Sequence, residues 1–408
     1  MADSATKPRS GADSPTKILF SSYGSEGDST PLINLAQLMV RQGDSVTLLL
    51  EPDGARRGQQ AGLVTQPLAG DLRSERQRSP QEKDPTLRLA RQNLAAWARQ
   101  TAAAAQDADV IVGSGLGAEA SQLAARHLGL PFVGVTMFPI VPTREFSSPL
   151  ALLPVPRFLN RPTHSFIQHL LWSEFGRHLK PVCQEWQMEL PKLDFTNHPT
   201  LCAVSPTLLP EPKDWPTAAR VVGDLRPVST ERQVLAPELE QFLAEGPAPI
   251  YLGFGSMTLP RPNQLATAIE QLAEHRRVIF APGWSGLKLA PTSNLFIAGH
   301  TPHEALFPRV AVVVHHGGAG TVHTAARLGA PQVIMPLGGD QAWWAERAQR
   351  AQIAPPPLRA KNFTASALQT AIRAAESLRP NALEVAQKMS TEDGTAEVAR
   401  VIRQVAGA

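Results

Sequence analysis

The residues best suited to bind a charged ligand lie in one short segment, 315–321, whose sequence is His-His-Gly-Gly-Ala-Gly-Thr. An apolar run at residues 310–314 precedes it and a helical pattern follows it, so the order predicts a strand, a tight turn and a helix N-terminus. The first N–H groups of such a helix have no intrahelical partners, and the helix dipole adds partial positive charge. The glycines let a ligand approach the backbone closely. The segment therefore predicts a site for a phosphate or diphosphate.

A carboxylate and an amide follow farther along the chain, at Asp340 and Gln341. Such side chains suit the hydroxyl groups of a sugar, so the two segments together predict a nucleotide-sugar site. The alternative for Asp340 is an N-cap of the helix that follows it.

A second glycine-containing turn, at residues 24–28, follows an apolar strand at residues 17–22. A nicotinamide dinucleotide site is disfavoured because the turn has G-x-x-G and not G-x-G-x-x-G, although Glu51 ends the next strand where a ribose-binding acid would lie. Two interpretations remain: a tight turn with a capping Asp28, or an Asp28 exposed in a cleft as a general base. A third turn, at residues 253–257, contains Ser256, whose hydroxyl could donate to a phosphate.

Metal binding is not predicted. Neighbouring residues of a strand point to opposite sides, so His315 and His316 would not converge on one ion, and no third ligand lies at a recognisable spacing. The Asp-x-Asp pair at residues 107–109 precedes its strand, which favours a helix end or a loop. We expect no metal and no cofactor.

The elements around these residues alternate between strand and helix, which predicts an α/β fold with parallel sheets. Thr30 is predicted to cap a helix that begins at Pro31 and ends at Gly43, between strands at 17–22 and 45–50. Residues 206–227 are rich in proline and predict a linker. The other predicted elements are 109–112, 119–128, 132–137, 165–188, 249–253, 264–274, 277–281, 295–298, 310–314, 321–328, 332–335, 341–351, 366–376 and 395–405. Two α/β halves with a linker near the middle predict a cleft between domains.

Composition excludes several classes of protein. The 408 residues are 43% hydrophobic and carry a net charge of +3, spread along the chain, so nucleic acid is not an expected partner. The exception is the arginine-rich segment 73–91, where interleaved acids and the lack of aromatic side chains favour a solvated, mobile loop over an RNA-binding patch. Two cysteines, Cys183 and Cys202, are expected to be reduced thiols of a cytoplasmic protein.

Membrane-spanning and secreted classes are also disfavoured. Residues 1–16 lack an apolar core and predict a disordered tail, not a secretory signal. No stretch is long and apolar enough to span a bilayer, so any membrane contact would be peripheral.

Several segments in order resemble those of the GT-B glycosyltransferases of the family-1 type, in the branch of sterol glucosyltransferases and glycopeptide-antibiotic glycosyltransferases. The resemblance covers nearly all of residues 17–400. Its specific pieces are residues 24–28 with Pro31, 214–216 before 222–223, 250–257, 301–309, 315–321, and Pro336 followed by 339–341.

The resemblance implies two Rossmann-like domains that face each other across a cleft. It implies an acceptor-binding domain at residues 17–215, a nucleotide-sugar-binding domain at 216–390, and a C-terminal helix at 391–408 that packs back on the first domain.

The resemblance also implies roles for the residues that match it. Asp28 would be the catalytic base, and Asp340 and Gln341 would hold the donor sugar. The main chain of Thr301, Pro302 and His303 would hold the base of the nucleotide. The diphosphate would be contacted by His315 and Ser256 and by donors of Gly317, Gly318, Ala319, Gly320 and Thr321.

The implied reaction is a metal-independent single displacement that inverts an α-linked donor. A hexose would pass from a UDP- or dTDP-sugar to a hydroxyl of an apolar small molecule, and the enzyme would be a monomer or a weak homodimer. A sugar-nucleotide epimerase on the same fold and a non-enzymatic nucleotide-sugar sensor are the alternatives. The chain departs from the branch at Glu26, where a basic residue is common, at the Trp343-Trp344 pair, and at 222–226, which lacks an aromatic run. These departures affect donor nucleotide and acceptor choice more than the reaction class.

Overall fold

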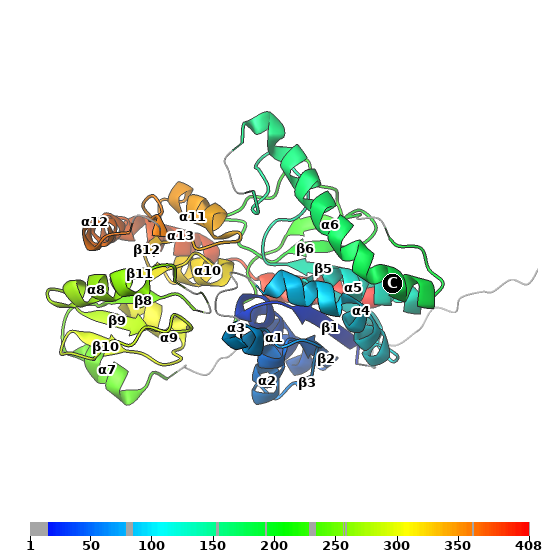
Figure 1. The fold of residues 1–408 in the computed structure, drawn as a ribbon, viewed down its shortest axis with the longest axis horizontal. Coiled ribbons are helices and arrows are strands. Elements are labelled where there is room, and N and C mark those ends of the chain that lie inside the picture. Colours follow the sequence, from blue (N-terminus) through cyan, green and yellow to red (C-terminus); the bar gives the residue numbers. More distant parts are fainter. Residues whose placement is uncertain are drawn as a thin grey trace, which may run out of the picture.

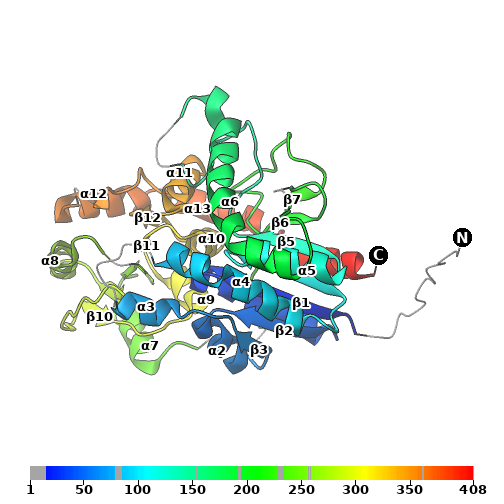
Figure 2. The same ribbon diagram turned by 45° about the vertical axis from the view of Figure 1, so that its right-hand side comes forward.

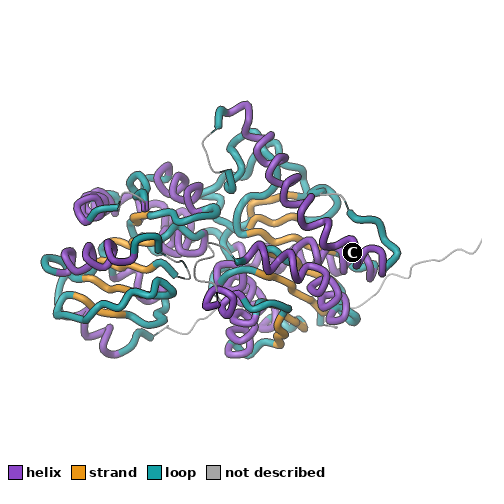
Figure 3. Tube along the Cα trace, in the orientation of Figure 1, coloured by secondary structure: helices purple, strands orange, loops and turns teal. Residues whose placement is uncertain are grey.

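The computed structural model describes residues 15–78, 85–151, 155–191, 194–227, 234–255, 257, 259–360 and 363–407. Most of the tail predicted at residues 1–16 lies outside this set. The described chain forms two parallel sheets, one on each side of the molecule, each with helices on both faces (Figures 1 and 3). The α/β fold with two parallel-sheet halves is therefore confirmed.

The first sheet has seven strands in the order β3-β2-β1-β4-β5-β6-β7, and all its paired strands are parallel. The strands are β1 Lys17–Tyr23, β2 Ser45–Leu50, β3 Val64–Pro67, β4 Val110–Gly115, β5 Phe132–Thr136, β6 Thr200–Cys202 and β7 Ala219–Val221. Its helices are α1 Glu26–Arg41, α2 Pro52–Gln60, α3 Leu72–Arg78, α4 Thr86–Ala104, α5 Ala118–Leu128, the short 3-10 helix η1 Arg157–Leu159, α6 Asn160–Glu185 and α14 Gly394–Ala406.

The second sheet has five strands in the order β10-β9-β8-β11-β12, again parallel. The strands are β8 Ile250–Gly253, β9 Val278–Ala281, β10 Leu295–Ile297, β11 Val312–His315 and β12 Gln332–Ile334. The helices are α7 Pro237–Ala244, α8 Pro262–Ala273, α9 His303–Leu306, η2 Phe307–Arg309, α10 Ala319–Arg327, α11 Gln341–Arg350, α12 Ala365–Glu376 and α13 Arg379–Met389.

Successive side chains of β1 point to opposite faces of the first sheet, and both faces are covered by helices. Ile18 and Phe20 point into a buried cluster shared with α1, α2 and α14, while Leu19 and Tyr23 point into another shared with α4, α5 and α6. A strand buried on both faces is apolar along its whole length, as the sequence of β1 is. The carboxyl ends of the central strands therefore carry the loops that can bind ligands.

The helix after β1 begins earlier than predicted. We expected Thr30 to cap a helix starting at Pro31, but α1 begins at Glu26 with Ser25 as N-cap, and Pro31 lies inside it. The backbone N–H of Ser25 donates to Asp28 Oδ2 over 2.7 Å, which is half of a capping box. This short-range pairing outweighs the preference of proline for the first helical position, and it puts Asp28 in the first turn of the helix.

The arginine-rich segment is largely helical, so the prediction of a mobile loop is wrong for its described part. Residues 72–78 form α3, and Arg88 and Arg91 lie on α4. Arg88 pairs with Glu75 at 2.8 Å and Arg91 with Glu174 at 3.2 Å. The neighbouring Leu89 and Ala90 are buried against the sheet, and this burial holds the segment in place. Lys83 lies outside the described residues.

The proline-rich linker contains a strand that the sequence did not predict. β7 pairs with β6, so the first sheet extends to Val221, past the boundary predicted at 215 and 216. Beyond it the chain crosses to the second sheet. It crosses back after α13 and ends in α14, the red helix at the letter C in Figure 2. Val398 and Ile402 of α14 are buried in the cluster shared with α1.

The two crossings touch at Gly223 and Gly394. A Cβ on Gly223, which has a φ of +102°, would lie 2.7 Å from the backbone nitrogen of Gly394. Nearby, Asp224 lies 3.2 Å from Arg327 of α10, so the linker is also tied to the second domain by a charge pair.

Candidate active site

The glycine-rich segment forms the strand, turn and helix N-terminus that its sequence predicts. β11 ends at His315, Gly317 turns the chain with a φ of +94°, and Gly318 is the N-cap of α10, which begins at Ala319. A Cβ on Gly317 would lie 2.7 Å from Ile334 Cγ2, so the turn packs too closely against β12 for a larger residue. The first N–H groups of α10 are thereby brought to the carboxyl edge of the second sheet.

His315 is fully buried and its ring has no nitrogen free for a ligand. Its Nδ1 accepts a hydrogen bond from the Gly317 N–H at 3.1 Å, and its Nε2 therefore carries the proton and donates to Gln332 Oε1 at 2.9 Å. Burial lowers the pKa of His315 to about 3, so the ring is neutral. The structure thus makes His315 a brace for the turn and does not support the predicted contact with the diphosphate.

His316 was considered from the sequence only as a metal ligand and was not predicted to contact the diphosphate. Its Nδ1 is buried without a hydrogen-bond partner among the described residues, and burial lowers its pKa to about 4. The imidazole of His316 packs against Gly318: a Cβ added to that glycine would lie only 2.6 Å from His316 Nε2. One feature of the sequence could have indicated this difference. Successive side chains of an extended chain point to opposite sides, so His316 is expected on the side opposite the buried His315.

Asp340 and Gln341 lie at the start of α11, but neither uses its side chain as a simple cap. Asp340 Oδ2 accepts a hydrogen bond from the indole N–H of Trp344 at 2.8 Å. Gln341 Oε1 accepts from the N–H of Leu337 and of Gly338, at 2.7 and 3.1 Å. Gln341 therefore fixes the loop after β12, and its amide nitrogen lies 3.6 Å from Met257 Sδ.

The segment predicted to hold the base lies beside the second sheet. Pro302 is the N-cap of the short helix α9. His303 Nε2 lies 3.2 Å from the hydroxyl of Tyr251, and its ring stacks on Phe307 at 4.3 Å. Burial lowers the pKa of His303 to about 4. The Thr301 hydroxyl donates to Gly299 O, so these side chains are held by the protein. Ser256 lies outside the described residues.

Asp28 lies at the carboxyl end of β1 with its carboxylate against Gly24. Its Oδ2 accepts both the backbone N–H and the hydroxyl of Ser25, at 2.7 and 3.2 Å. A Cβ on Gly24 would lie 2.2 Å from Asp28 Oδ2, so any larger residue there would have to displace the carboxylate. Burial raises the pKa of Asp28, and the two bonds from Ser25 oppose this effect.

Two further carboxylates, Glu26 and Glu51, lie beside Asp28, and the sequence did not predict their grouping. Glu51 is 4% exposed, and burial raises its pKa to about 7. The guanidinium of Arg57 on α2 lies 3.3 Å from Glu51 Oε1 and 3.1 Å from Glu26 Oε1, and it donates to the Ser29 hydroxyl at 2.7 Å. One cation thus joins the first turn of α1 to the end of β2.

The two halves of the site face each other. Burial raises the pKa of Asp340 to about 6; the hydrogen bond from Trp344 opposes this rise, and the negative charge of Asp28 adds a smaller upward contribution. Glu26 Oε1 also lies 3.9 Å from His300 Nε2, across the same boundary. The structure therefore brings Asp28 of the first domain near Asp340 of the second.

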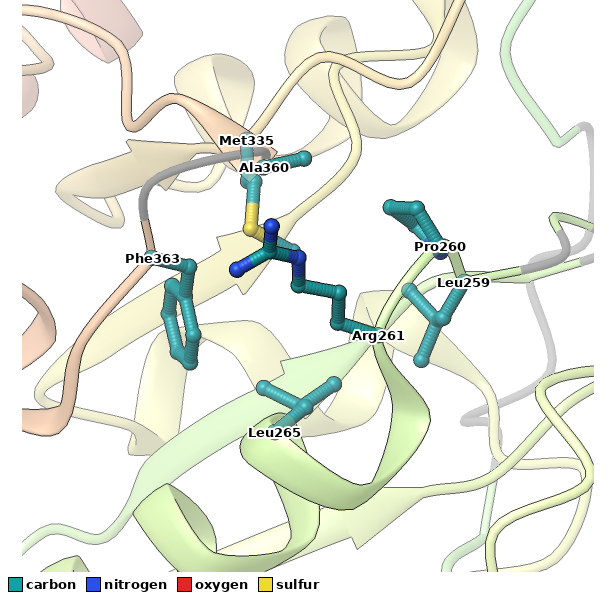
Figure 4. A pocket seen from close by; sticks show the side chains of 7 residues that line it. All are labelled: Leu259, Pro260, Arg261, Leu265, Met335, Ala360 and Phe363. Atoms are coloured by element: carbon teal, nitrogen blue, oxygen red, sulfur yellow. The ribbon is translucent and has the colours of Figure 1, made fainter.

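A small pocket lies between the start of α8 and the chain that follows β12 (Figure 4). Arg261 extends its guanidinium between Met335, Ala360 and Phe363, with Leu265 below it. None of the predicted site residues lines this pocket. Within the described residues, no three or more His, Cys, Asp or Glu side chains gather as a metal site would require. None of the described helices is long and apolar enough to cross a membrane.

Comparison with known proteins agrees with this fold and arrangement. Residues 282–405 match the family described as "Erythromycin biosynthesis protein CIII-like, C-terminal domain". The chain is 33% identical over 348 residues to glycosyltransferase GtfE of Amycolatopsis orientalis, covering 81% of this chain and 83% of the relative. It is 32% identical over 406 residues to the vancomycin aglycone glucosyltransferase of the same organism, covering 95% and 97%. It is 27% identical over 411 residues to sterol 3-beta-glucosyltransferase UGT80A2 of Arabidopsis thaliana, covering 94% and 64%.

Solved structures share the fold at lower sequence identity. The kitacinnamycin glycotransferase superposes with a TM-score of 0.74 at 18% identity, covering 96% of this chain and 99% of that one. VinC, solved in complex with dTDP, superposes with a TM-score of 0.66 at 20% identity, covering 96% and 99%. The chain belongs to the family-1 type of GT-B glycosyltransferases, and it is a glycosyltransferase.

Proposed function

We propose that the enzyme transfers a hexose from a UDP- or dTDP-sugar to a hydroxyl group of an apolar small molecule, with inversion and without a metal ion. The vancomycin aglycone and sterol glucosyltransferases act, by their names, on a natural product and on sterols, so acceptors of these kinds are the first to test. The first domain would bind the acceptor and the second the donor.

On the donor side, the diphosphate would lie at the N-terminus of α10. The N–H groups of Gly318, Ala319 and Gly320 and the hydroxyl of Thr321 would donate to it, with Ser256 assisting. We assign the histidine contact to His316 in place of His315, because its Nδ1 has no partner within the described residues. Gly317 would permit the turn. The main chain of residues 301–303 would hold the base of the nucleotide. VinC, which was solved in complex with dTDP, supports a donor with this nucleotide.

The donor sugar would contact the carboxylate of Asp340, which has one oxygen beyond the one bound by Trp344. Gln341 would contribute through its amide N–H groups, because its Oε1 already accepts two backbone bonds.

Asp28 would accept the proton of the acceptor hydroxyl as the new bond to the sugar forms. An ordinary aspartate, with a pKa of about 3.9, is a weak base, and the upward shift that burial imposes on Asp28 makes it a stronger one. The observation that carries the proposal is that Asp28 lies near enough to Asp340 for its charge to raise the pKa of that carboxyl, which would set the proposed base opposite the proposed sugar-binding group.

The test replaces Asp28→Asn and measures glycoside formation by mass spectrometry together with donor binding by calorimetry. We expect transfer to fall by at least about a hundredfold with donor affinity retained. Turnover at the wild-type rate would contradict the role of Asp28. Release of nucleotide without any acceptor would favour the epimerase, and tight donor binding with no turnover on any acceptor would favour the sensor.

A further inference from the structure

Large apolar side chains are exposed together at one place, the start of α6. Phe158 is 79% exposed and Phe166 69%, and Leu159 and Leu170 are exposed beside them. We call residues 157–170 the α6 tip. The other large apolar side chains exposed in the described part of the chain are scattered over separate elements. A clustered exposed apolar surface marks an interaction site more often than single exposed residues do.

The α6 tip presents one helical face outward. Leu159, Phe166 and Leu170 are spaced by seven and four residues, which puts them on the same side of the helix. In both ribbon views the N-terminal part of α6 projects beyond the neighbouring elements, away from both sheets (Figures 1 and 2). A flat surface could therefore reach this face without meeting the rest of the molecule first.

Within residues 157–170 the only Asp, Glu, Lys or Arg side chains are those of two arginines. Between Glu145 and Glu174 the sequence contains no Asp or Glu, whereas Arg157 and Arg161 lie at the tip and are exposed. Arg161 is close enough to Asp214 to help lower the pKa of that carboxyl, but local hydrogen bonds from Thr143 and Arg144 contribute more. Exposed phenylalanines beside arginines, with no carboxylate among them, fit the interface of an anionic bilayer.

We propose that the α6 tip docks on the surface of an anionic lipid bilayer, with Phe158 and Phe166 entering the interface and Arg157 and Arg161 contacting the headgroups. The proposal does not depend on the donor, the acceptor or the role of Asp28. For the apolar acceptors proposed above, docking of this kind would bring the enzyme to molecules dissolved in a membrane.

The test uses the full chain and flotation with vesicles of phosphatidylcholine, alone or mixed with phosphatidylglycerol. We expect binding to the mixed vesicles that weakens with salt. Phe158→Ser with Phe166→Ser is expected to weaken binding at least about tenfold, and Arg157→Glu with Arg161→Glu about fivefold or more per charge. All these residues are exposed, so thermal unfolding should be nearly unchanged in each variant.

Matched controls lie elsewhere on the surface. Leu383→Ser removes an exposed leucine of α13, and Arg359→Glu with Arg373→Glu makes the same change of charge in the second domain. These variants should float with the vesicles like the wild type. Absence of binding, equal loss in tip and control variants, or a dimer in sedimentation that the Phe158→Ser and Phe166→Ser pair dissociates would each overturn the proposal, the last by showing that a second copy covers the tip.

Discussion

The guanidinium of Arg57 lies 3.3 Å from the carboxylate of Glu51, where β2 ends and α2 begins. The same guanidinium contacts Glu26, Ser29 and Thr30 in the first two turns of α1. Asp28 lies in this part of α1, so the contacts of Arg57 fix the position of the proposed base without touching it.

Arg57→Met should therefore lower kcat more than it raises the KM of the donor. The expected loss is about tenfold, because a small displacement of the base is enough to misalign it. Arg57→Lys should recover part of the rate, and Arg56→Met, a change at the exposed neighbour on α2, should leave it unchanged. Steady-state kinetics on all three variants checks this, and equal kcat in wild type and Arg57→Met would refute it.

Glu51 should make the protein less stable as the pH rises. Its pKa is about 7 in the folded chain against 4.5 ordinarily, because burial disfavours its charged form. The folded state therefore binds the proton more tightly, so this group stabilises most below pH 4.5 and the effect is lost as the pH rises to about 7. Glu51→Gln should gain stability relative to wild type over that range, by on the order of 2 to 3 kcal/mol. Urea unfolding at several pH values measures it, and a gap that is independent of pH would argue against the shift.

The two neighbouring histidines should differ in what their replacement affects. His315→Asn removes buried hydrogen bonds and should lower the free energy of unfolding by about 1 to 3 kcal/mol. His316→Asn should leave stability nearly unchanged and weaken the binding of UDP or dTDP by about tenfold or more. Calorimetry with the nucleotide and thermal unfolding separate the two effects. The reverse pattern would restore His315 as the diphosphate contact.

Gly24→Ala should lower kcat by displacing the carboxylate of Asp28. The new Cβ would lie 2.2 Å from Asp28 Oδ2, so the carboxylate must move. Gly27→Ala is the matched control, since its Cβ would meet only Ser25 Oγ at an ordinary 3.6 Å. We expect kcat to fall at least about tenfold in the first variant and little in the second. Similar activity in both would show that the carboxylate can shift without loss.

Trp344→Phe should affect the sugar and not the nucleotide. It removes the indole N–H that binds Asp340 Oδ2 at 2.8 Å and leaves that carboxylate free to turn. Binding of the nucleotide sugar should weaken by about threefold to tenfold, while binding of the bare nucleoside diphosphate stays the same. Trp343→Phe changes the neighbouring indole, which packs on Phe146 of the first domain, and serves as control. Equal losses for both ligands would mean that the change acts on the fold.

Local sequence patterns predicted the strand, turn and helix around residues 315–321, because glycines and an apolar run act over a few residues. They also predicted the parallel α/β class. They did not predict β6 and β7, which have three residues each and exist because they pair with a sheet built elsewhere. They also misplaced the start of α1, where a capping box decided the outcome.

At the site, the sequence predicted roles for Asp28 and Asp340 but could not show that they lie near each other, since they belong to different domains. The grouping of Glu51, Arg57 and Glu26 depends on how α1 and α2 pack, which no spacing reveals. The choice between His315 and His316 depends on Gln332, a residue of the next strand that occupies one ring and leaves the other free.

The touching backbones of Gly223 and Gly394 limit how the two domains can move. Two domains joined by a single linker can rotate relative to each other in many directions. Here the chain passes twice, with the two passages in direct contact, and such a double connection restricts rotation between the domains more than a single passage would. Any relative movement that separated Asp28 from Asp340 would therefore have to bend both passages together.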